Sequence, residues 1–294
     1  MNSLAERGPR RVESRQNARI KELRAGLSRG ARTTHNHIAI EGLHLVQEAA
    51  RSGLKLQTVF VRRGSEGLLQ QLALGGELSL NGAEVLSVAE EVFSSAAMTE
   101  HPQGIAALVE APEFTVQATL KKTPGRTPLV VIAGGLQDPG NLGTLVRSAE
   151  AFGATGMILL PGTVSLWNAK TLRASSGSAF RLPVVALAAD AAFAALRAEG
   201  VRIFAAVARD GASQADLRGP SALLLGNEGA GLPDAWVASA DARVTIPCPG
   251  AVESLNAAIA GSVLLYDAMR QRQAMAQMPA APAKQQETVG QLHT

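Results

Sequence analysis

Three short polar segments of this sequence, each following an apolar run, carry the residues that could do chemistry. The first is VVIAGGLQDPGN (130–141), which leads into a helical pattern containing Arg147. We expect Asn141 to cap this helix, and Arg147 to lie off the apolar stripe, from where its guanidinium can reach a ligand of the loop. Polar helix entrances after buried strands are where α/β proteins bind ligands. Taken alone, a simple cap and a solvated cation explain the segment equally well.

The second segment is ALLLGNEGAGL (222–232), in which an apolar run ends on glycine. Gly226 and Gly229 flank Asn227 and Glu228, and the absence of side chains on either flank lets a ligand approach the backbone closely. For this segment by itself, an ordinary β-turn with an exposed glutamate is the alternative.

The third segment is VTIPCPGAVESLNAAIAGS, which starts at residue 244. Pro247 and Pro249 restrict the chain between an expected strand and an expected helix, and Ser254 and Asn256 cluster where that helix begins. Helix capping accounts for one of these polar residues but not easily for both, with a glutamate beside them. The segment therefore indicates a third loop suited to a ligand.

These loops belong to a zone, residues 129–273, in which nearly continuous apolar runs alternate with helical patterns. Such runs are typical of parallel strands covered on both faces. Strands are expected at 129–134, 157–160, 184–187, 203–208, 222–226 and 244–247. A helix over 142–152 has an apolar stripe, and so does a helix over 255–270, made of Leu255, Ile259, Val263 and Tyr266. The pattern predicts a doubly wound α/β domain with a parallel sheet.

The zone before it, residues 17–110, also alternates short apolar runs with helical patterns and indicates a smaller α/β domain. Residues 111–128 contain three prolines and no sustained period, which is typical of a linker. Residues 1–16 are expected to form a basic flexible arm. Residues 274–294, rich in Ala, Gln and Pro, are expected to be a disordered tail.

Basic residues are concentrated at the start of the chain. Residues 1–32 hold nine Arg or Lys against three Glu, a local net charge of +6 on a chain of net charge +3. A basic arm on a mildly acidic body favours a nucleic-acid partner over a merely solvated arginine-rich helix. Since aromatic residues make up only 3% of the chain, recognition of backbone and shape is expected rather than a base-stacking platform. The candidate contacts are Arg15, Arg19, Lys21 and Arg32.

Several classes of protein fit the sequence poorly. It has no apolar run of 18 residues or more and no apolar stretch near its first residue, and its one cysteine, Cys248, cannot form an intrachain disulfide. We therefore expect a cytoplasmic protein without membrane contact. His35 and His37 lack further ligands at supporting spacing, so no metal is expected. SSGS (175–178) and GGLQDPGNLG do not match the hydrolase and dinucleotide-binding motifs.

In their order and spacing, NLGTLVRSAEAFG, LLLGNEGAGL and IPCPGAVESLNAAIAGSVLLYD resemble the three motifs of the SpoU/TrmH branch of the SPOUT RNA methyltransferases, which methylate the ribose 2′-hydroxyl. SRQNARIKELRAG (14–26), IAIEGLHLVQEA (38–49) and HPQGIAALVE (101–110) are similar to the substrate-binding domain of the ribosomal RNA members. The resemblance implies a trefoil knot in the C-terminal α/β domain, a homodimer that builds the active site, and bent S-adenosylmethionine in the knotted loops.

The resemblance also implies roles for individual residues. By motif, the polar catalytic set is Asn141, Arg147, Glu228, Ser254 and Asn256. The residues implied for the cofactor are Leu225, Gly226, Asn227, Gly229, Ile246 and Leu255. RASSGSAFRLP (173–183) resembles a further family segment, which adds Arg173 to the RNA-binding candidates.

Transfer from the activated sulfonium needs no metal, only positioning and a nucleophilic hydroxyl. The family proposal makes Arg147 the base. A guanidinium effectively never loses its proton, however, so Arg147 could instead bind a neighbouring phosphate and stabilise the developing oxyanion.

Two other functions stay open at this point. The same chemistry could act on transfer RNA, although the separate substrate domain favours ribosomal RNA by analogy. The chain could also be a non-catalytic RNA-binding protein with a methyltransferase-like core. Every polar motif position is filled, which argues against such decay.

Overall fold

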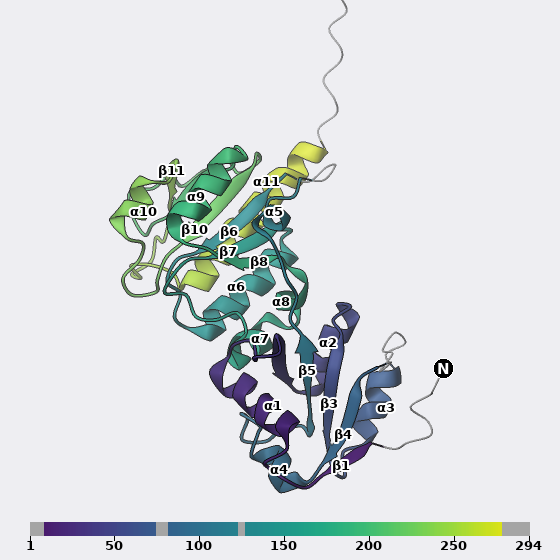
Figure 1. Cartoon of the computed structure of the whole chain (residues 1–294). Helices are drawn as coiled ribbons and strands as arrows, with labels where there is room; N and C mark the ends of the chain where they lie inside the picture. The colour runs from purple at the N-terminus through teal and green to yellow at the C-terminus, as the bar shows by residue number, and fades with distance from the viewer. Residues whose placement is uncertain (1–8, 75–81, 123–126, 278–294) are drawn as a thin grey trace, which may run out of the picture.

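The computed structural model describes residues 9–74, 82–122 and 127–277, which form two α/β domains lying end to end (Figure 1). The N-terminal domain has a five-stranded mixed sheet in the order β1-β4-β3-β5-β2. Its strands are β1 (Arg10–Val12), β2 (His37–Glu41), β3 (Leu56–Arg62), β4 (Glu84–Val88) and β5 (Ile105–Glu110). Strand β5 is antiparallel to both of its neighbours, whereas β1 and β3 are parallel to β4.

Helices cover both faces of this sheet because its strands are apolar on both sides. On β2, Ala39 faces the cluster built around α1, and Ile38 and Ile40 face the opposite cluster, which contains α2 residues. The helices are α1 (Ala18–Arg29), α2 (Leu43–Arg51), α3 (Gly67–Leu74) and α4 (Glu90–Ser94). The expected small α/β domain is therefore present.

The prediction that residues 1–16 form a flexible arm is wrong for residues 10–12, which form strand β1. It pairs in parallel with β4, with Arg10 opposite Leu86 and Val12 opposite Val88. Val12 is buried in the core, and Arg10 forms an ion pair with Glu84 at 2.5 Å. A three-residue strand with one buried side chain is too short to show a period in the sequence. Residues 1–8 of the expected arm lie outside the described residues.

The C-terminal domain contains a six-stranded, fully parallel sheet in the order β11-β9-β10-β6-β7-β8. Five expected strands are confirmed to within about two residues, but the last ends at Val244, before the prolines, which cannot donate to a sheet. The strands are β6 (Leu129–Ala133), β7 (Gly156–Leu159), β8 (Val184–Ala186), β9 (Arg202–Ala206), β10 (Ser221–Leu225) and β11 (Ala242–Val244).

The helices of this domain form two layers, as expected for a doubly wound fold. One face of the sheet is covered by α6 (Pro139–Ala151), α7 (Ala169–Ser175), α8 (Ser178–Arg181) and α11 (Ala257–Ala276). The other face is covered by α5 (Val116–Thr119), α9 (Ala189–Ala198) and α10 (Asp234–Ala238). Within the described residues, no helix is both long and apolar enough to cross a membrane.

The predicted segment boundaries differ from the structure at two places. The expected linker contains α5, whose Thr119 is buried and accepts a hydrogen bond from Thr155 at 2.6 Å, so this segment packs on the C-terminal domain. Helix α11 ends at Ala276, three residues past the expected boundary. Residues 278–294 of the expected tail lie outside the described residues.

The stripe predicted for α11 is not the face that packs on the domain core. Ile259, Val263 and Tyr266 are 53%, 42% and 51% exposed. The buried face is instead Ala258, Gly261, Leu264, Leu265 and Ala268. A Cβ on Gly261 would lie only 2.5 Å from a Leu145 methyl carbon, so glycine permits the close packing. Because α11 is apolar on two faces, periodicity could not show which one packs inward.

Arg272 fastens the C-terminal part of α11 to the rest of the domain. Its guanidinium donates to four backbone carbonyl oxygens, those of Thr127, Pro128, Leu217 and Gly219, at 2.6 to 3.0 Å. Burial lowers the pKa of Arg272 to about 10, so the group is still charged at neutral pH.

Replacing Arg272 with alanine is expected to lower the free energy of unfolding by about 2–4 kcal/mol, because partly buried carbonyls lose their donor. Urea denaturation measures the change. Arg270→Ala is the matched control, since Arg270 is exposed and, in the part of the chain that the structure describes, its ion-pair partner is Asp267 one turn away, a pair worth about 0.5 kcal/mol or less. Equal unfolding midpoints for the two variants would contradict this role.

Candidate active site

The fold brings the three polar segments together at one edge of the C-terminal sheet. They follow β6, β10 and β11, and parallel strands place their carboxyl ends at the same edge. The first segment enters α6, the second is the loop 226–232, and the third is the loop 245–256 before α11. Residues more than 100 positions apart therefore meet.

Asn141 connects all three segments. Its amide Nδ2 donates to Glu228 Oε1 at 2.9 Å, and its Oδ1 accepts from Asn256 Nδ2 at 3.1 Å. Asn256 also caps α11, with its Oδ1 accepting from the backbone N–H of Ala258 at 2.9 Å. Three of the five predicted catalytic side chains thus form one hydrogen-bonded chain.

The prediction that Asn141 caps α6 is wrong. Asp138 is the cap, and its Oδ1 accepts from the backbone N–H of Asn141 at 2.8 Å. Pro139 at the first helical position favours this earlier start, so the Asn141 amide is free to bridge the other two loops. The Asn141 N–H bond and the Lys170 ammonium, 3.0 Å away, hold the pKa of Asp138 below its usual range.

The loop after β10 is shaped by Asn227. Its Oδ1 accepts from the backbone N–H groups of Gly229 and Ala230, at 2.8 and 3.0 Å, and its Nδ2 donates to the carbonyl of Gly135 at 2.8 Å. The side chain of Asn227 is therefore engaged within the protein. Gly226 is held tightly, since a Cβ there would lie 2.6 Å from the backbone carbon of Gly231.

A hollow of about 290 Å³ lies between this loop, the end of β9 and the start of α11. The side chains that line it are mostly apolar, but polar groups form a comparable share of its exposed surface, with the carboxylate of Glu228 and the hydroxyl of Ser254 among them. All six residues expected for the cofactor line it: Leu225, Gly226, Asn227, Gly229, Ile246 and Leu255. A hollow with apolar side chains and several polar groups suits a small-molecule ligand.

Other residues that line the hollow were not predicted from the sequence. Ala206 ends β9, Val207 and Ala208 follow it, and Cys248 and Leu264 also line the wall. The apolar run IFAAVA predicted the strand, but nothing in the sequence showed that β9 lies beside β10. Cys248 is half-buried and carries no disulfide.

Arg147 is exposed on α6 and does not line the hollow. Within the described residues, its guanidinium has no hydrogen-bond or ion-pair partner. It follows Asn141 by six residues, about 9 Å along the helix axis. The next residue, Ser148, accepts a hydrogen bond from Ser262 of α11 at 2.7 Å, so Arg147 lies beside the contact between α6 and α11.

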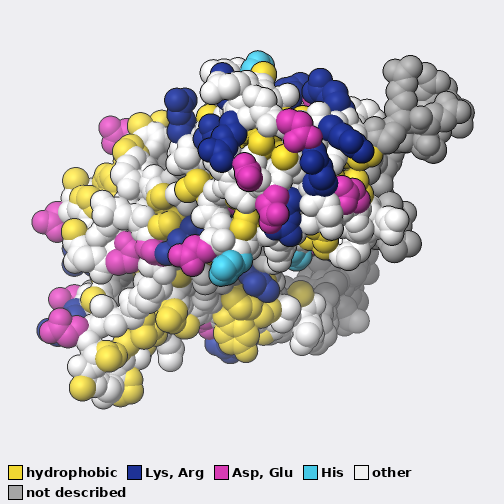
Figure 2. All heavy atoms as spheres, turned by 90° about the horizontal axis from the view of Figure 1, so that it is seen from below, with side chains coloured by type: hydrophobic (Ala, Val, Ile, Leu, Met, Phe, Trp, Pro, Cys, Tyr) yellow, Lys and Arg dark blue, Asp and Glu magenta, His cyan; other side chains and the backbone are white. Residues whose placement is uncertain are grey.

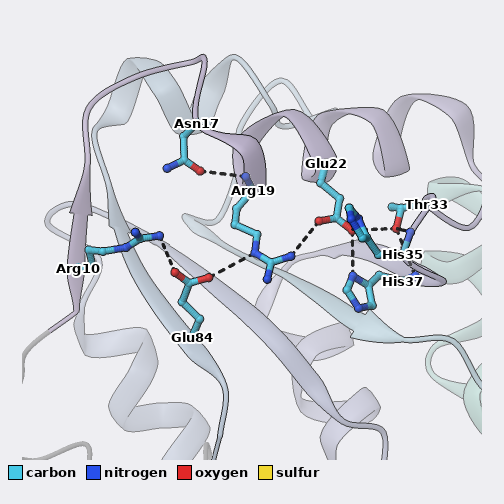
Figure 3. Close-up of polar contacts among 8 residues, drawn as sticks. All are labelled: Arg10, Asn17, Arg19, Glu22, Thr33, His35, His37 and Glu84. Atoms are coloured by element: carbon cyan, nitrogen blue, oxygen red, sulfur yellow. Dashed lines mark hydrogen bonds and ion pairs between the residues drawn. The ribbon is translucent and has the colours of Figure 1, made fainter.

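The RNA-binding candidates separate into free and engaged side chains. Arg15, Lys21 and Arg173 are exposed. Arg19 instead lies between Glu84 and Glu22, at 3.3 and 3.1 Å (Figure 3). Arg32 contacts Trp167, as described below.

Figure 3 also shows that His35 and His37 both contact the carboxylate of Glu22. This contact was not predicted from the sequence. Burial acts to raise the pKa of Glu22, but hydrogen bonds from Thr33, His37 and Arg19 outweigh it and hold the pKa below its usual range. Among the described residues, no three or more His, Cys, Asp or Glu side chains are arranged to hold a metal ion.

Basic side chains do not form an uninterrupted surface. On the face in Figure 2, Lys and Arg side chains gather on one side with Asp and Glu side chains among them. Any polyanion bound there meets both signs of charge, so a few free cations matter more than the net charge.

Comparison with known proteins agrees with this fold. Residues 128–266 match the SpoU rRNA methylase family, and residues 17–107 match the MRM3-like substrate binding domain. The 23S rRNA (guanosine(2553)-2′-O)-methyltransferase RlmP of Bacillus subtilis is 34% identical over 259 residues, covering 87% of this chain and 98% of that protein. The 23S rRNA (uridine(2479)-2′-O)-methyltransferase of Streptomyces viridochromogenes is 32% identical, covering 92% and 96%.

Among solved structures, the SpoU methyltransferase AviRb from Streptomyces viridochromogenes in complex with AdoMet superimposes with a TM-score of 0.76 at 29% identity, covering 88% of this chain and 99% of that one. The fold is that of an α/β-knot RNA methyltransferase. The chain belongs to the SpoU rRNA methylase family, and its C-terminal domain has the trefoil-knotted fold of these enzymes.

Proposed function

We propose that this protein transfers the methyl group of S-adenosylmethionine to a ribose 2′-hydroxyl of ribosomal RNA. The observation that carries the proposal is the hydrogen-bonded junction of Asn141, Glu228 and Asn256 beside the hollow. The two 23S rRNA relatives named above act on a guanosine and on a uridine, so what they share is the ribose rather than the base. With such a substrate, the enzyme works in the cytoplasm.

The hollow suits S-adenosylmethionine by its chemistry. Leu225, Ile246 and Leu255 offer apolar walls to the adenosine, and Gly226 permits the close packing on Gly231 and Leu232 that shapes the loop at this wall. Glu228 at the same hollow provides a negative charge where a cationic ligand binds. When bound, S-adenosylmethionine supplies an activated sulfonium methyl, so the protein needs to position the acceptor rather than generate a strong electrophile.

The polar residues divide the remaining work. Asn141, Glu228 and Asn256 hold the three loops in register, and Ser254 faces the hollow. The unpaired guanidinium of Arg147 binds the RNA phosphate, orients the ribose and stabilises the negative charge that develops on the 2′-oxygen. It does this as a cation, since it stays protonated at neutral pH.

The active form is a homodimer through α11. Ile259, Val263 and Tyr266 form an exposed apolar stripe, and Tyr266 packs edge-on against Phe152 of α6. Contiguous exposed apolar side chains mark interaction surfaces, and a two-fold dimer buries the same patch of both copies. Because Asn256 caps this helix, the stripe begins within one turn of the junction, and the site lies at the edge of the interface.

Val263→Arg is expected to give a monomer with methylation reduced at least tenfold, because a charge in the centre of the stripe cannot be buried unpaired. Sedimentation velocity reports the oligomeric state. Met98→Arg is the control, since Met98 is similarly exposed at 52% but lies in the N-terminal domain. If the wild-type protein is a monomer, or if Val263→Arg is still a dimer, the stripe is not the dimer interface.

The direct test uses S-[methyl-³H]adenosylmethionine and unmodified total RNA. After ribosomal and transfer RNA are separated, digestion to nucleosides shows where the label is. Label on a 2′-O-methylnucleoside from ribosomal RNA supports the proposal. Label in transfer RNA instead would show that transfer RNA is the substrate. RNA binding without any label would identify a non-catalytic RNA-binding protein.

A further inference from the structure

A second cavity lies at the junction of the two domains, away from the hollow expected for the methyl donor. It measures about 580 Å³ and is formed where β7 and β8 end, by residues 159–167 and 184–188, with Arg32 of the N-terminal domain at its edge. A cavity that both domains build is present only when they are docked as in this structure.

The junction side of the cavity carries a stacked pair. The guanidinium carbon of Arg32 lies 5.7 Å from the centre of the Trp167 ring, which is cation–π geometry. Arg32 is held there by hydrogen bonds to Asn36 at 3.0 Å and to the carbonyl of Pro112 at 2.9 Å. Trp167 is half-buried, and its indole N–H has no acceptor among the described residues. The Arg32 guanidinium also pairs with Glu113 at 3.6 Å, so its charge is partly compensated. What the pair offers to a ligand is therefore a fixed surface for stacking.

Two hydrogen bonds through Gly135 link the wall of this cavity to the wall of the hollow. Thr163, in its wall, accepts a hydrogen bond from the backbone N–H of Gly135 at 3.0 Å. The carbonyl of Gly135 accepts from Asn227, which lines the hollow, at 2.8 Å. Strands β7 and β10 flank β6, so their carboxyl ends lie about 10 Å apart. A nucleotide neighbouring the one that is methylated can reach this cavity.

We propose that the cavity binds an unpaired base next to the methylated nucleotide, stacked on the Arg32–Trp167 pair. This rests on the proposed function, because it names how that RNA substrate is read. Unpaired bases of RNA stack on aromatic rings and on arginine planes. The exposed Ser165, whose hydroxyl among the described residues only accepts a hydrogen bond from the backbone N–H of Trp167, offers a donor to a base edge. The low aromatic content of the chain predicted recognition of RNA backbone and shape rather than stacking of bases. One of the two tryptophans nevertheless lies in this cavity, and one aromatic ring is enough to stack one base.

Kinetics of Trp167→Ala and Trp167→Phe test this proposal on an RNA fragment that the wild-type enzyme methylates. With alanine, KM for RNA is expected to rise about tenfold or more, as for loss of one stacked base, with kcat little changed. Phenylalanine should restore most of the affinity. Fluorescence gives an independent readout: RNA should quench the emission of the wild-type protein, and this quenching should be lost in Trp167→Phe, which retains Trp236.

A set of RNA fragments, each lacking one base near the target, tests the proposal without any protein variant. One abasic position should raise KM for the wild-type enzyme, and the same position should have no further effect in Trp167→Ala. Equal KM values for all fragments, together with unchanged quenching in Trp167→Phe, would overturn the base site while leaving methylation intact. If the wild-type enzyme methylates no RNA, the proposed function fails instead, and the quenching experiment still reports on the cavity.

Discussion

Replacing Arg147 with alanine is expected to lower kcat by about 100- to 1000-fold, the range typical for loss of one group that stabilises developing charge. Affinity for S-adenosylmethionine should not change, because Arg147 does not line the hollow. The fold should be unaffected as well, since this exposed guanidinium makes no hydrogen bond or ion pair within the described residues.

Single-turnover methylation and calorimetric titration with S-adenosylmethionine separate these two effects. Arg147→Lys keeps the charge but loses the planar fork, so it should recover only part of the rate. A large loss of cofactor affinity in Arg147→Ala would instead place Arg147 in cofactor binding. Wild-type turnover in that variant would exclude it from catalysis.

The second large effect is expected for Gly226→Ala, which should raise the dissociation constant for S-adenosylmethionine by about 10- to 100-fold. The new methyl group would lie 2.6 Å from Gly231 and 2.7 Å from Leu232, and both contacts are with backbone atoms that cannot rotate away. The loop that lines the hollow must therefore move. Forced packing of this kind costs about 1–3 kcal/mol, and each 1.4 kcal/mol is tenfold in affinity.

Calorimetric titration measures the affinity, and thermal unfolding confirms that the variant is folded. Gly219→Ala is the matched control at the other end of β10, because a Cβ there has no atom within 4 Å. Binding by Gly226→Ala that equals the control would show that the loop 226–232 is not part of the cofactor site.

The local chemistry of the sequence determined much of this protein. Apolar runs gave the parallel strands, because strands buried on both faces need continuous apolar residues. Turn-forming residues after 129–134, 222–226 and 244–247 indicated the three polar loops, because turn preferences act within a few residues. The six residues that the family resemblance implied for the cofactor lie on or beside these loops and line the hollow, and their role in cofactor binding stays a prediction.

Only the tertiary structure shows which segments lie next to each other, and several features of this protein depend on that. Only the sheet order places Ala206 beside Leu225, and only packing decides that Leu264 rather than Val263 faces the core. The stacking of Arg32 on Trp167, across two domains, is likewise invisible in sequence spacing. Periodicity records that a side chain is apolar, but not which surface covers it, because that surface comes from residues far away along the chain.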